Sequence, residues 1–154
     1  MNNPAVPPGQ PEPQREDDPL KLQALHEKCS GCRTCLVACA LENFRQINPA
    51  KAVLRIQGLF PGPGTYRIHL CDQCGACAEV CPEDAIRLEN DVYQVDPDQC
   101  TGCMLCVEEC PHDVMCAHAE LEAPAKCTLC GACVDACPRG ALFLAEETED
   151  APLT

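Results

Sequence analysis

The chain has 154 residues, of which 17 are cysteine and 15 are proline, and it contains no tryptophan and only five Phe or Tyr residues. An aromatic-rich hydrophobic core of ordinary size is therefore not expected, and cysteine chemistry has to supply part of the stability. The formal net charge of −13 disfavours nucleic acid and anionic lipid as partners, because both are bound through basic residues.

The N-terminal segment, residues 1–20, is rich in Pro, Gln and acidic residues and predicts a disordered or extended arm. Its sequence MNNPAVPPGQPEPQREDDP has no basic n-region, no apolar h-region and no twin arginine, so it does not resemble a signal peptide. No stretch of about 18 apolar residues predicts a membrane span. We therefore expect a cytoplasmic protein in a reducing compartment, where thiols stay available for metals.

Four cysteine blocks follow the arm, and each has the spacing C-x2-C-x2-C-x3-C. Together they use sixteen of the seventeen cysteines, so this internal repeat is the first feature to interpret. The last cysteine is followed by proline in blocks two, three and four, and by alanine in block one. The blocks are Cys29, Cys32, Cys35 and Cys39; Cys71, Cys74, Cys77 and Cys81; Cys100, Cys103, Cys106 and Cys110; and Cys127, Cys130, Cys133 and Cys137.

The segments around the blocks predict small elements. LVACALENF at 36–44 predicts a short helix, and the three residues before the last cysteine of each block predict a helical turn. KAVLRIQGLF and TYRIHL predict two strands joined by a turn at PGPG, residues 61–64, where prolines remove donors and glycines allow a reversal. AIRLEN and VYQVD alternate around an Asn-Asp turn and predict a hairpin. Residues 145–154 predict an acidic tail.

The block spacing indicates cubic 4Fe-4S clusters. C-x2-C-x2-C presents three thiolates around one face of a cluster, and in bacterial two-cluster ferredoxins the fourth cysteine ligates the other cluster. Zinc sites with four cysteines instead use C-x2-C pairs about 12–20 residues apart and have no use for a third cysteine at the next step. A disulfide framework explains the regular blocks no better.

Several residues outside this pattern are predicted to carry no chemistry. Cys116 is expected to be a structural or incidental thiol. His112 and His118 have no spare cysteine pair and no carboxylate placed with them to complete a ligand set, so no second metal site is expected there. Four glycines beside cysteines are expected where the backbone approaches a cluster and its amides point at sulfur, namely Gly31, Gly75, Gly102 and Gly131.

Two levels of resemblance follow from these motifs. CDQCGACAEVCPEDAI through DPDQCTGCMLCVEECP is similar to a bacterial two-cluster ferredoxin. The span from Cys29 to Leu144 resembles the four-cluster electron-transfer subunits of molybdopterin and tungstopterin oxidoreductases. Within this span, four stretches look most like the small iron-sulfur subunit of tungsten-containing aldehyde oxidoreductases: CSGCRTCLVACALENF, NPAKAVLRI, CDQCGAC and KCTLCGACVDACPRGAL. Larger members carry longer blocks and C-terminal extensions, so a soluble complex is expected here.

This resemblance implies an α+β fold of two interleaved ferredoxin-like modules, a duplicated dicluster ferredoxin, within a four-cluster domain at 21–144. The inner module is 71–110, the outer module combines 29–39 with 127–137, and a hairpin insertion occupies 45–70. A serial arrangement, with blocks one and two paired and blocks three and four paired, stays open. The implied ligand sets are Cys29, Cys32, Cys35 and Cys137; Cys71, Cys74, Cys77 and Cys110; Cys100, Cys103, Cys106 and Cys81; and Cys127, Cys130, Cys133 and Cys39.

The expected function is a one-electron relay through four 4Fe-4S clusters, without catalysis by this chain alone. The resemblance implies a catalytic tungstopterin or molybdopterin subunit at one end and a flavin subunit or a soluble acceptor at the other. An accessory or maturation iron-sulfur protein and a free polyferredoxin stay open as alternatives, as does stacking of several copies into a longer conductor. Each cluster adds a charge of about −2, which would take the loaded protein from −13 to roughly −21.

Overall fold

The computed structural model describes residues 20–146, and these form a small α+β fold. Residues 1–19 of the predicted arm and most of the acidic tail lie outside the described residues, whereas Leu20, predicted as part of the arm, belongs to a strand. In chain order the elements are β1 (Leu20–Ala24), η1 (His26–Lys28), α1 (Thr34–Phe44), η2 (Pro49–Lys51), β2 (Arg55–Gly58), β3 (Tyr66–His69), α2 (Ala76–Glu79), β4 (Ile86–Glu89), β5 (Val92–Val95), α3 (Leu105–Glu108), α4 (Ala132–Ala136) and β6 (Leu142–Glu146).

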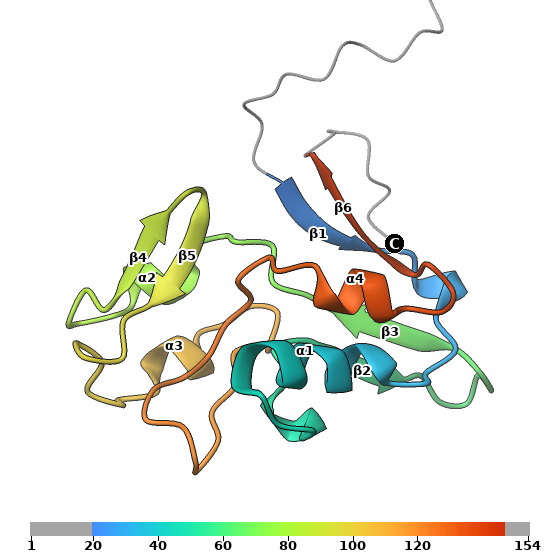
Figure 1. Ribbon diagram of the computed structural model, residues 1–154, viewed down its shortest axis with the longest axis horizontal. Coiled ribbons are helices and arrows are strands. Elements are labelled where there is room, and N and C mark those ends of the chain that lie inside the picture. The colour runs from blue at the N-terminus through green and yellow to red at the C-terminus, as the bar shows by residue number, and fades with distance from the viewer. Residues whose placement is uncertain (1–19, 147–154) are drawn as a thin grey trace, which may run out of the picture.

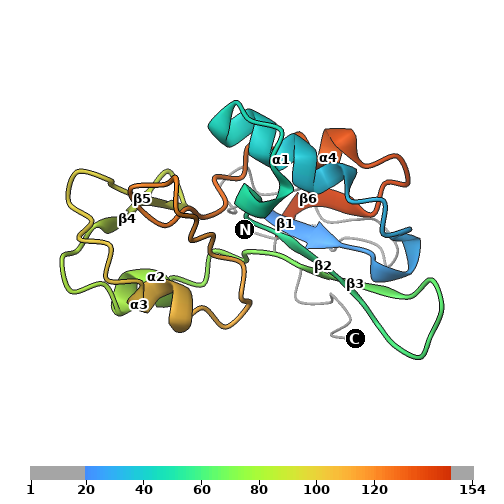
Figure 2. The same cartoon turned by 90° about the horizontal axis from the view of Figure 1, so that it is seen from below.

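The elements gather into two lobes that lie side by side in both views (Figures 1 and 2). The outer lobe contains β1, α1, β2, β3, α4 and β6, and the inner lobe contains α2, β4, β5 and α3. Helix α1 packs on α4, and α2 packs on α3. The chain therefore enters the outer lobe, builds the inner lobe from its middle, and returns to complete the outer lobe.

An antiparallel pair formed by β1 and β6 closes the outer lobe, with Leu22 opposite Leu144. Neither strand was predicted from the sequence, and the predicted bounds of the four-cluster domain, 21–144, fall within the two strands. The two strands lie near opposite ends of the described chain, so no local turn in the sequence indicates that they pair. Their contact brings the segment before block one next to the segment after block four.

The other two strand pairs are the hairpins that the sequence predicted. β4 pairs with β5, with Ile86 opposite Val95, and β2 pairs with β3, with Arg55 opposite His69. The Asn-Asp turn is confirmed by positive φ angles at Asn90 and Asp91. The PGPG segment closes the second hairpin as predicted.

Helix α1 confirms the predicted helix at 36–44 and extends it at its N-terminus. Its buried residues are Cys35, Leu36, Cys39 and Ala40, which recur at helical spacing and so share one face. The helix ends at Phe44, and the following residue, Arg45, adopts a left-handed conformation with φ 55° and donates its N–H to the Leu41 carbonyl. Two cysteines of block one are thereby aimed into the outer lobe from a single helix.

Both lobes use cysteines as core residues. The buried core of the outer lobe combines aliphatic side chains such as Val53, Leu54 and Ile68 with five cysteines. The buried core of the inner lobe holds only Ile86 and Met115 besides two cysteines. Among residues 20–146, no helix is long and apolar enough to cross a membrane.

Candidate metal centres

All four cysteine blocks adopt the same loop. In each, the residues before and after the second cysteine have positive φ, and a helix begins directly after the second of these residues. Only one residue of each pair is glycine, so each block holds one other side chain in a conformation that costs energy. The pairs are Gly31 and Arg33, Gln73 and Gly75, Gly102 and Met104, and Leu129 and Gly131.

The repeated loop gives the cysteines of every block the same exposure. The second cysteine of each block is exposed, namely Cys32, Cys74, Cys103 and Cys130. The third cysteine of each block is buried, namely Cys35, Cys77, Cys106 and Cys133. Each block therefore offers one sulfur at the surface and one in the core, and none of the seventeen cysteines, all of which lie among residues 20–146, forms a disulfide.

Three cavities are each lined by three cysteines of one block and one cysteine of another. Their volumes are similar, about 360, 340 and 340 Å³ including space open to solvent. The first is lined by Cys127, Cys130, Cys133 and Cys39, the second by Cys29, Cys32, Cys35 and Cys137, and the third by Cys100, Cys103, Cys106 and Cys81. These three groups are three of the four ligand sets predicted for the nested arrangement. The assignment of the sixteen cysteines as ligands itself stays a prediction.

The remaining set joins block two to Cys110. A polar contact links the two segments, with His112 Nε2 3.0 Å from the Asp72 carboxylate. The sequence analysis expected no carboxylate near His112, and this was wrong, since Asp72 is distant in sequence. Asp72, Cys74 and His112 bring their ligand atoms within 4.8 Å of one another, but Cys74 already belongs to the predicted cluster ligands.

Burial raises the thiol pKa at most of the buried ligand positions. The pKa is raised to about 12 at Cys127 and Cys133 and to about 11 at Cys35 and Cys106, in each case mainly by desolvation. Neighbouring cysteines raise these pKa values further. Such thiols stay protonated at neutral pH, so a metal has to displace their protons when it binds. Acid therefore favours release of the metal.

The donor set fits a 4Fe-4S cluster. Four sulfurs converge on one cavity, the loop supplies three of them, and the surroundings are mainly apolar. Backbone amides also donate to cysteine sulfurs at 3.3–3.4 Å, from Ala85 to Cys81, Gly102 to Cys100, Leu129 to Cys127 and Ala141 to Cys137. Of the four glycines expected in this role, only Gly102 donates such a bond among the described contacts.

Two of the other glycines meet tyrosine rings. A Cβ at Gly31 would lie 2.3 Å from the Tyr66 ring, and a Cβ at Gly75 would lie 2.7 Å from the Tyr93 hydroxyl. Both glycines also have positive φ, 70° and 83°. Glycine is required here because the tyrosine of the adjacent hairpin lies against the loop and leaves no room for a Cβ.

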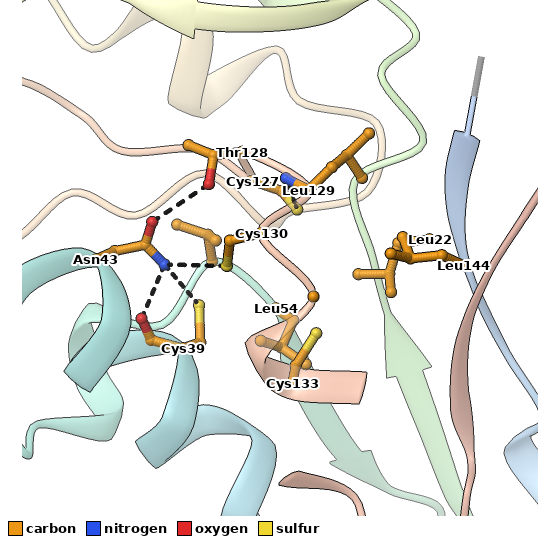
Figure 3. A pocket seen from close by; sticks show the side chains of 12 residues that line it. Leu22, Cys39, Asn43, Leu54, Cys127, Thr128, Leu129, Cys130, Cys133 and Leu144 are labelled. Carbon is orange, nitrogen blue, oxygen red and sulfur yellow. Dashed lines mark hydrogen bonds between the residues drawn. The ribbon is translucent and has the colours of Figure 1, made fainter. Parts of the chain in front are cut away.

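Asn43, near the C-terminal end of α1, points its side-chain amide at one cavity (Figure 3). Its Nδ2 donates to the Cys39 carbonyl at 2.8 Å and lies 3.7 Å from Cys39 Sγ and 4.0 Å from Cys130 Sγ. Thr128 Oγ1 donates to Asn43 Oδ1 at 3.4 Å and orients the amide. Sequence reasoning missed this residue, because only folding brings block four to the end of α1.

Replacing Asn43 by leucine is expected to lower one reduction potential and leave three unchanged. The change keeps the size of the side chain but removes the donor beside Cys39 and Cys130, and a donor to sulfur favours the more negative, reduced form. A hydrogen bond of about 0.5–1.5 kcal/mol corresponds to as much as about tenfold, or about 59 mV. Redox titration followed by EPR measures the shift. Thr128→Val keeps the donor and should shift the same potential less.

Cys116 is buried and lines none of the three four-sulfur cavities, and its role as a structural or incidental thiol stays a prediction. It forms a short antiparallel bridge with Ala125, and its Sγ donates to the Ala50 carbonyl at 3.4 Å. Its exposed fraction is 6%, close to the 5% of Cys39. The two residues are therefore a matched pair of buried cysteines, one inside a block and one outside.

Comparison with known proteins defines the class. A 4Fe-4S dicluster domain matches residues 28–86, another 4Fe-4S dicluster domain matches residues 70–114, and a 4Fe-4S binding domain matches residues 123–143. Together these matches cover all four cysteine blocks. They support an iron-sulfur protein of the electron-transfer type, built from 4Fe-4S domains.

Individual relatives carry electron-transfer names. The polyferredoxin-like subunit of an aliphatic sulfonate oxidoreductase from Pyrococcus furiosus is 40% identical over 65 residues, which are 41% of this chain and 36% of that protein. The electron transport protein HydN from Escherichia coli is 33% identical over 82 residues, which are 49% of this chain and 46% of that protein. The matches span about half or less of these relatives.

The active site complex BamBC of benzoyl coenzyme A reductase, in complex with zinc, matches with a TM-score of 0.48 at 20% identity. The alignment covers 90% of this chain and 85% of that one. A likeness at this level carries no functional conclusion.

Proposed function

We propose that this chain is the electron-transfer subunit of an oxidoreductase complex and relays single electrons through four 4Fe-4S clusters. The observation that carries the proposal is the fourfold cysteine loop, with one exposed and one buried sulfur in every copy. A single cluster with such a loop would suit a simple carrier, whereas four in a chain of this length suit a conductor between two partners. The proposed location is the reducing cytoplasm.

The proposed ligands are the four nested sets. Cys29, Cys32 and Cys35 act with Cys137, and Cys127, Cys130 and Cys133 act with Cys39. Cys71, Cys74 and Cys77 act with Cys110, and Cys100, Cys103 and Cys106 act with Cys81. The three four-sulfur cavities and the packing of α1 on α4 support this assignment over the serial one.

The proposed order of the sites is block one, block four, block two and block three. The first two sites share α1 and α4, since Cys35 and Cys39 lie on α1. Block four reaches block two across the lobe junction, where Gln73 Nε2 donates to the Cys127 carbonyl at 2.9 Å. Blocks two and three meet where α2 packs on α3. This order makes a continuous row with two ends.

When bound, each cluster would take up and release one electron. The work of the chain is to hold the sulfurs, exclude water and stabilise charge. Buried third cysteines anchor each site, and exposed second cysteines leave one edge near the surface for exchange with a partner. Amides of Ala85, Leu129 and Ala141 donate to sulfur and favour the reduced form, so they raise the potential of their sites.

The proposed catalytic partner is a tungstopterin subunit of the aldehyde oxidoreductase type, with a flavin subunit or a soluble acceptor at the other end. This partner rests on the resemblance of the four motifs. The name of the Pyrococcus furiosus relative supports a subunit role and suggests other oxidoreductases as partners.

The test is elemental analysis of the native complex, purified without oxygen through a tag on this chain. About sixteen irons per chain are expected, together with tungsten in the co-purified catalytic subunit. Molybdenum in place of tungsten would move the partner to another pterin enzyme. Iron with neither heavy metal would contradict the complex and favour an accessory protein or a free polyferredoxin. Zinc without iron would refute the clusters themselves.

A further inference from the structure

A buried lysine lies at the junction of the two lobes. Lys126 directly precedes block four, and only 7% of its surface is exposed. Its Nζ donates to Gln73 Oε1 at 2.6 Å, to the Tyr93 carbonyl at 2.9 Å and to the Cys127 carbonyl at 3.5 Å. It also lies 5.8 Å from the centre of the Tyr93 ring. Residues of both lobes therefore surround this cation.

The partners of Lys126 are all neutral. Among residues 20–146, none of the ion pairs includes Lys126, and its hydrogen bonds end on an amide oxygen and two carbonyls. A buried charge is costly unless an opposite charge compensates it. The described part of the chain thus leaves the charge of Lys126 without a carboxylate counter-ion.

The groups that can compensate this charge are cysteine sulfurs on both sides of the junction. Lys126 directly precedes Cys127, the first cysteine of block four. Its Nζ lies 2.6 Å from Oε1 of Gln73, and Gln73 stands between Cys71 and Cys74 of block two. Lys126 therefore lies beside the proposed ligands of two different blocks.

Gln73 fixes the lysine between the two blocks. It lies in the block two loop with φ 59°, one of the positions that hold a non-glycine residue in a strained conformation. Its Oε1 accepts from Lys126 and from the Tyr93 N–H at 3.1 Å, while its Nε2 donates to the Cys127 carbonyl. One side chain thus joins block two, the inner hairpin and the start of block four around the cation.

We propose that Lys126 is the shared counter-ion of the two middle clusters, those of blocks two and four, and that it raises the reduction potentials of both. The proposal rests on the proposed function, since it requires clusters in these two blocks. A cluster with four thiolates is negative, and reduction adds one more negative charge. A nearby buried cation stabilises the reduced form more than the oxidised form, because its field is weakly screened in the interior.

The test uses the complete protein with its clusters and measures potentials by EPR-monitored redox titration. In Lys126→Met, two of the four potentials are expected to fall and two to stay. Each fall should correspond to at least about a tenfold weaker reduction equilibrium, which is 59 mV for a one-electron couple. Lys126→Arg keeps the charge and should restore both potentials toward those of the unchanged protein.

Lys28→Met is the matched control. Lys28 directly precedes block one as Lys126 precedes block four, but it is exposed. Both variants change the net charge equally, but solvent screens the charge of the exposed Lys28. Lys28→Met should therefore shift every potential by much less. Equal shifts in the two variants would reduce the effect to net charge and overturn the proposal, as would four unchanged potentials in Lys126→Met.

A second variant covers the case in which Lys126→Met takes up its clusters poorly. Gln73→Glu has nearly the same shape and sets a carboxylate against Lys126 Nζ, so it should lower the same two potentials. Cluster loss in both variants would make Lys126 a structural residue and overturn the proposal. Iron content separates a failure of the proposed function from a failure of the role of Lys126. Fewer than four clusters in the unsubstituted protein would refute both. Four clusters with unshifted potentials in Lys126→Met would refute only the role of Lys126.

Discussion

Replacing Cys39 and Cys130 together by alanine is expected to remove one cluster and to leave three. Both residues line the cavity of block four, and Asn43 approaches both sulfurs. In the nested arrangement they serve the same site, so the second substitution adds no further loss. Intact four-iron clusters are counted from the iron content and from Mössbauer spectra of the protein purified without oxygen.

The serial arrangement makes the opposite forecast. There Cys39 would serve block two, so Cys39→Ala with Cys130→Ala would remove two clusters. The complementary pair Cys39→Ala with Cys74→Ala should remove two clusters in the nested arrangement and one in the serial arrangement. The two double variants therefore have to differ in a fixed direction, and the reverse difference would refute the nested sets.

Cys116→Ala is the control for these substitutions. Cys116 is as deeply buried as Cys39 but lines none of the three four-sulfur cavities. Its loss should leave all four clusters in place and cost stability only through the small cavity that the alanine creates. A missing cluster in this variant would show that packing alone governs cluster loss.

Removal of iron is expected to unfold the protein, and the inner lobe first. Metal binding energy is folding energy in small metal domains. The buried core of the inner lobe has only Ile86 and Met115 besides cysteines, whereas the outer lobe also buries aliphatic side chains from β1, β2, β3 and β6. Without clusters, the cavity lined by Cys81, Cys100, Cys103 and Cys106 would stay unfilled.

Hydrogen exchange after stepwise chelation measures this order. Amides of β4 and β5 should lose protection before those of β1 and β6, and circular dichroism should show loss of most regular structure once iron is gone. Restoring iron and sulfide under reducing conditions should return the protection. Iron-free protein with the exchange pattern of the loaded protein would contradict the dependence of the fold on its clusters.

Local features were predictable from the sequence because they depend on neighbours along the chain. The cysteine blocks, the helix that includes Leu36 and the two hairpins follow from spacing, alternation and turn residues. The one-turn helices begin earlier than the sequence indicated, at Ala76 and Leu105, because each starts directly after a residue with positive φ. No propensity rule places Gln73 or Leu129 in that conformation.

Features that depend on contacts between distant segments were missed. β1 and β6 have ordinary strand sequences of five residues, and only their partner across the chain makes them a pair. Asn43 has no motif, because its cavity is completed by block four. Lys126 precedes a cysteine just as Lys28 does, and the sequence contains nothing that says which of the two is buried.

The pairing of β1 with β6 also governs the order in which the protein can be assembled during translation. The ribosome delivers β1 and block one early, but β6 and α4 emerge only after the inner lobe has been made. The inner lobe can therefore fold and take up metal first, while the cysteines of block one wait for their neighbours. During that interval the thiols of block one have no cluster to bind, so we expect a reducing surrounding to protect them from oxidation.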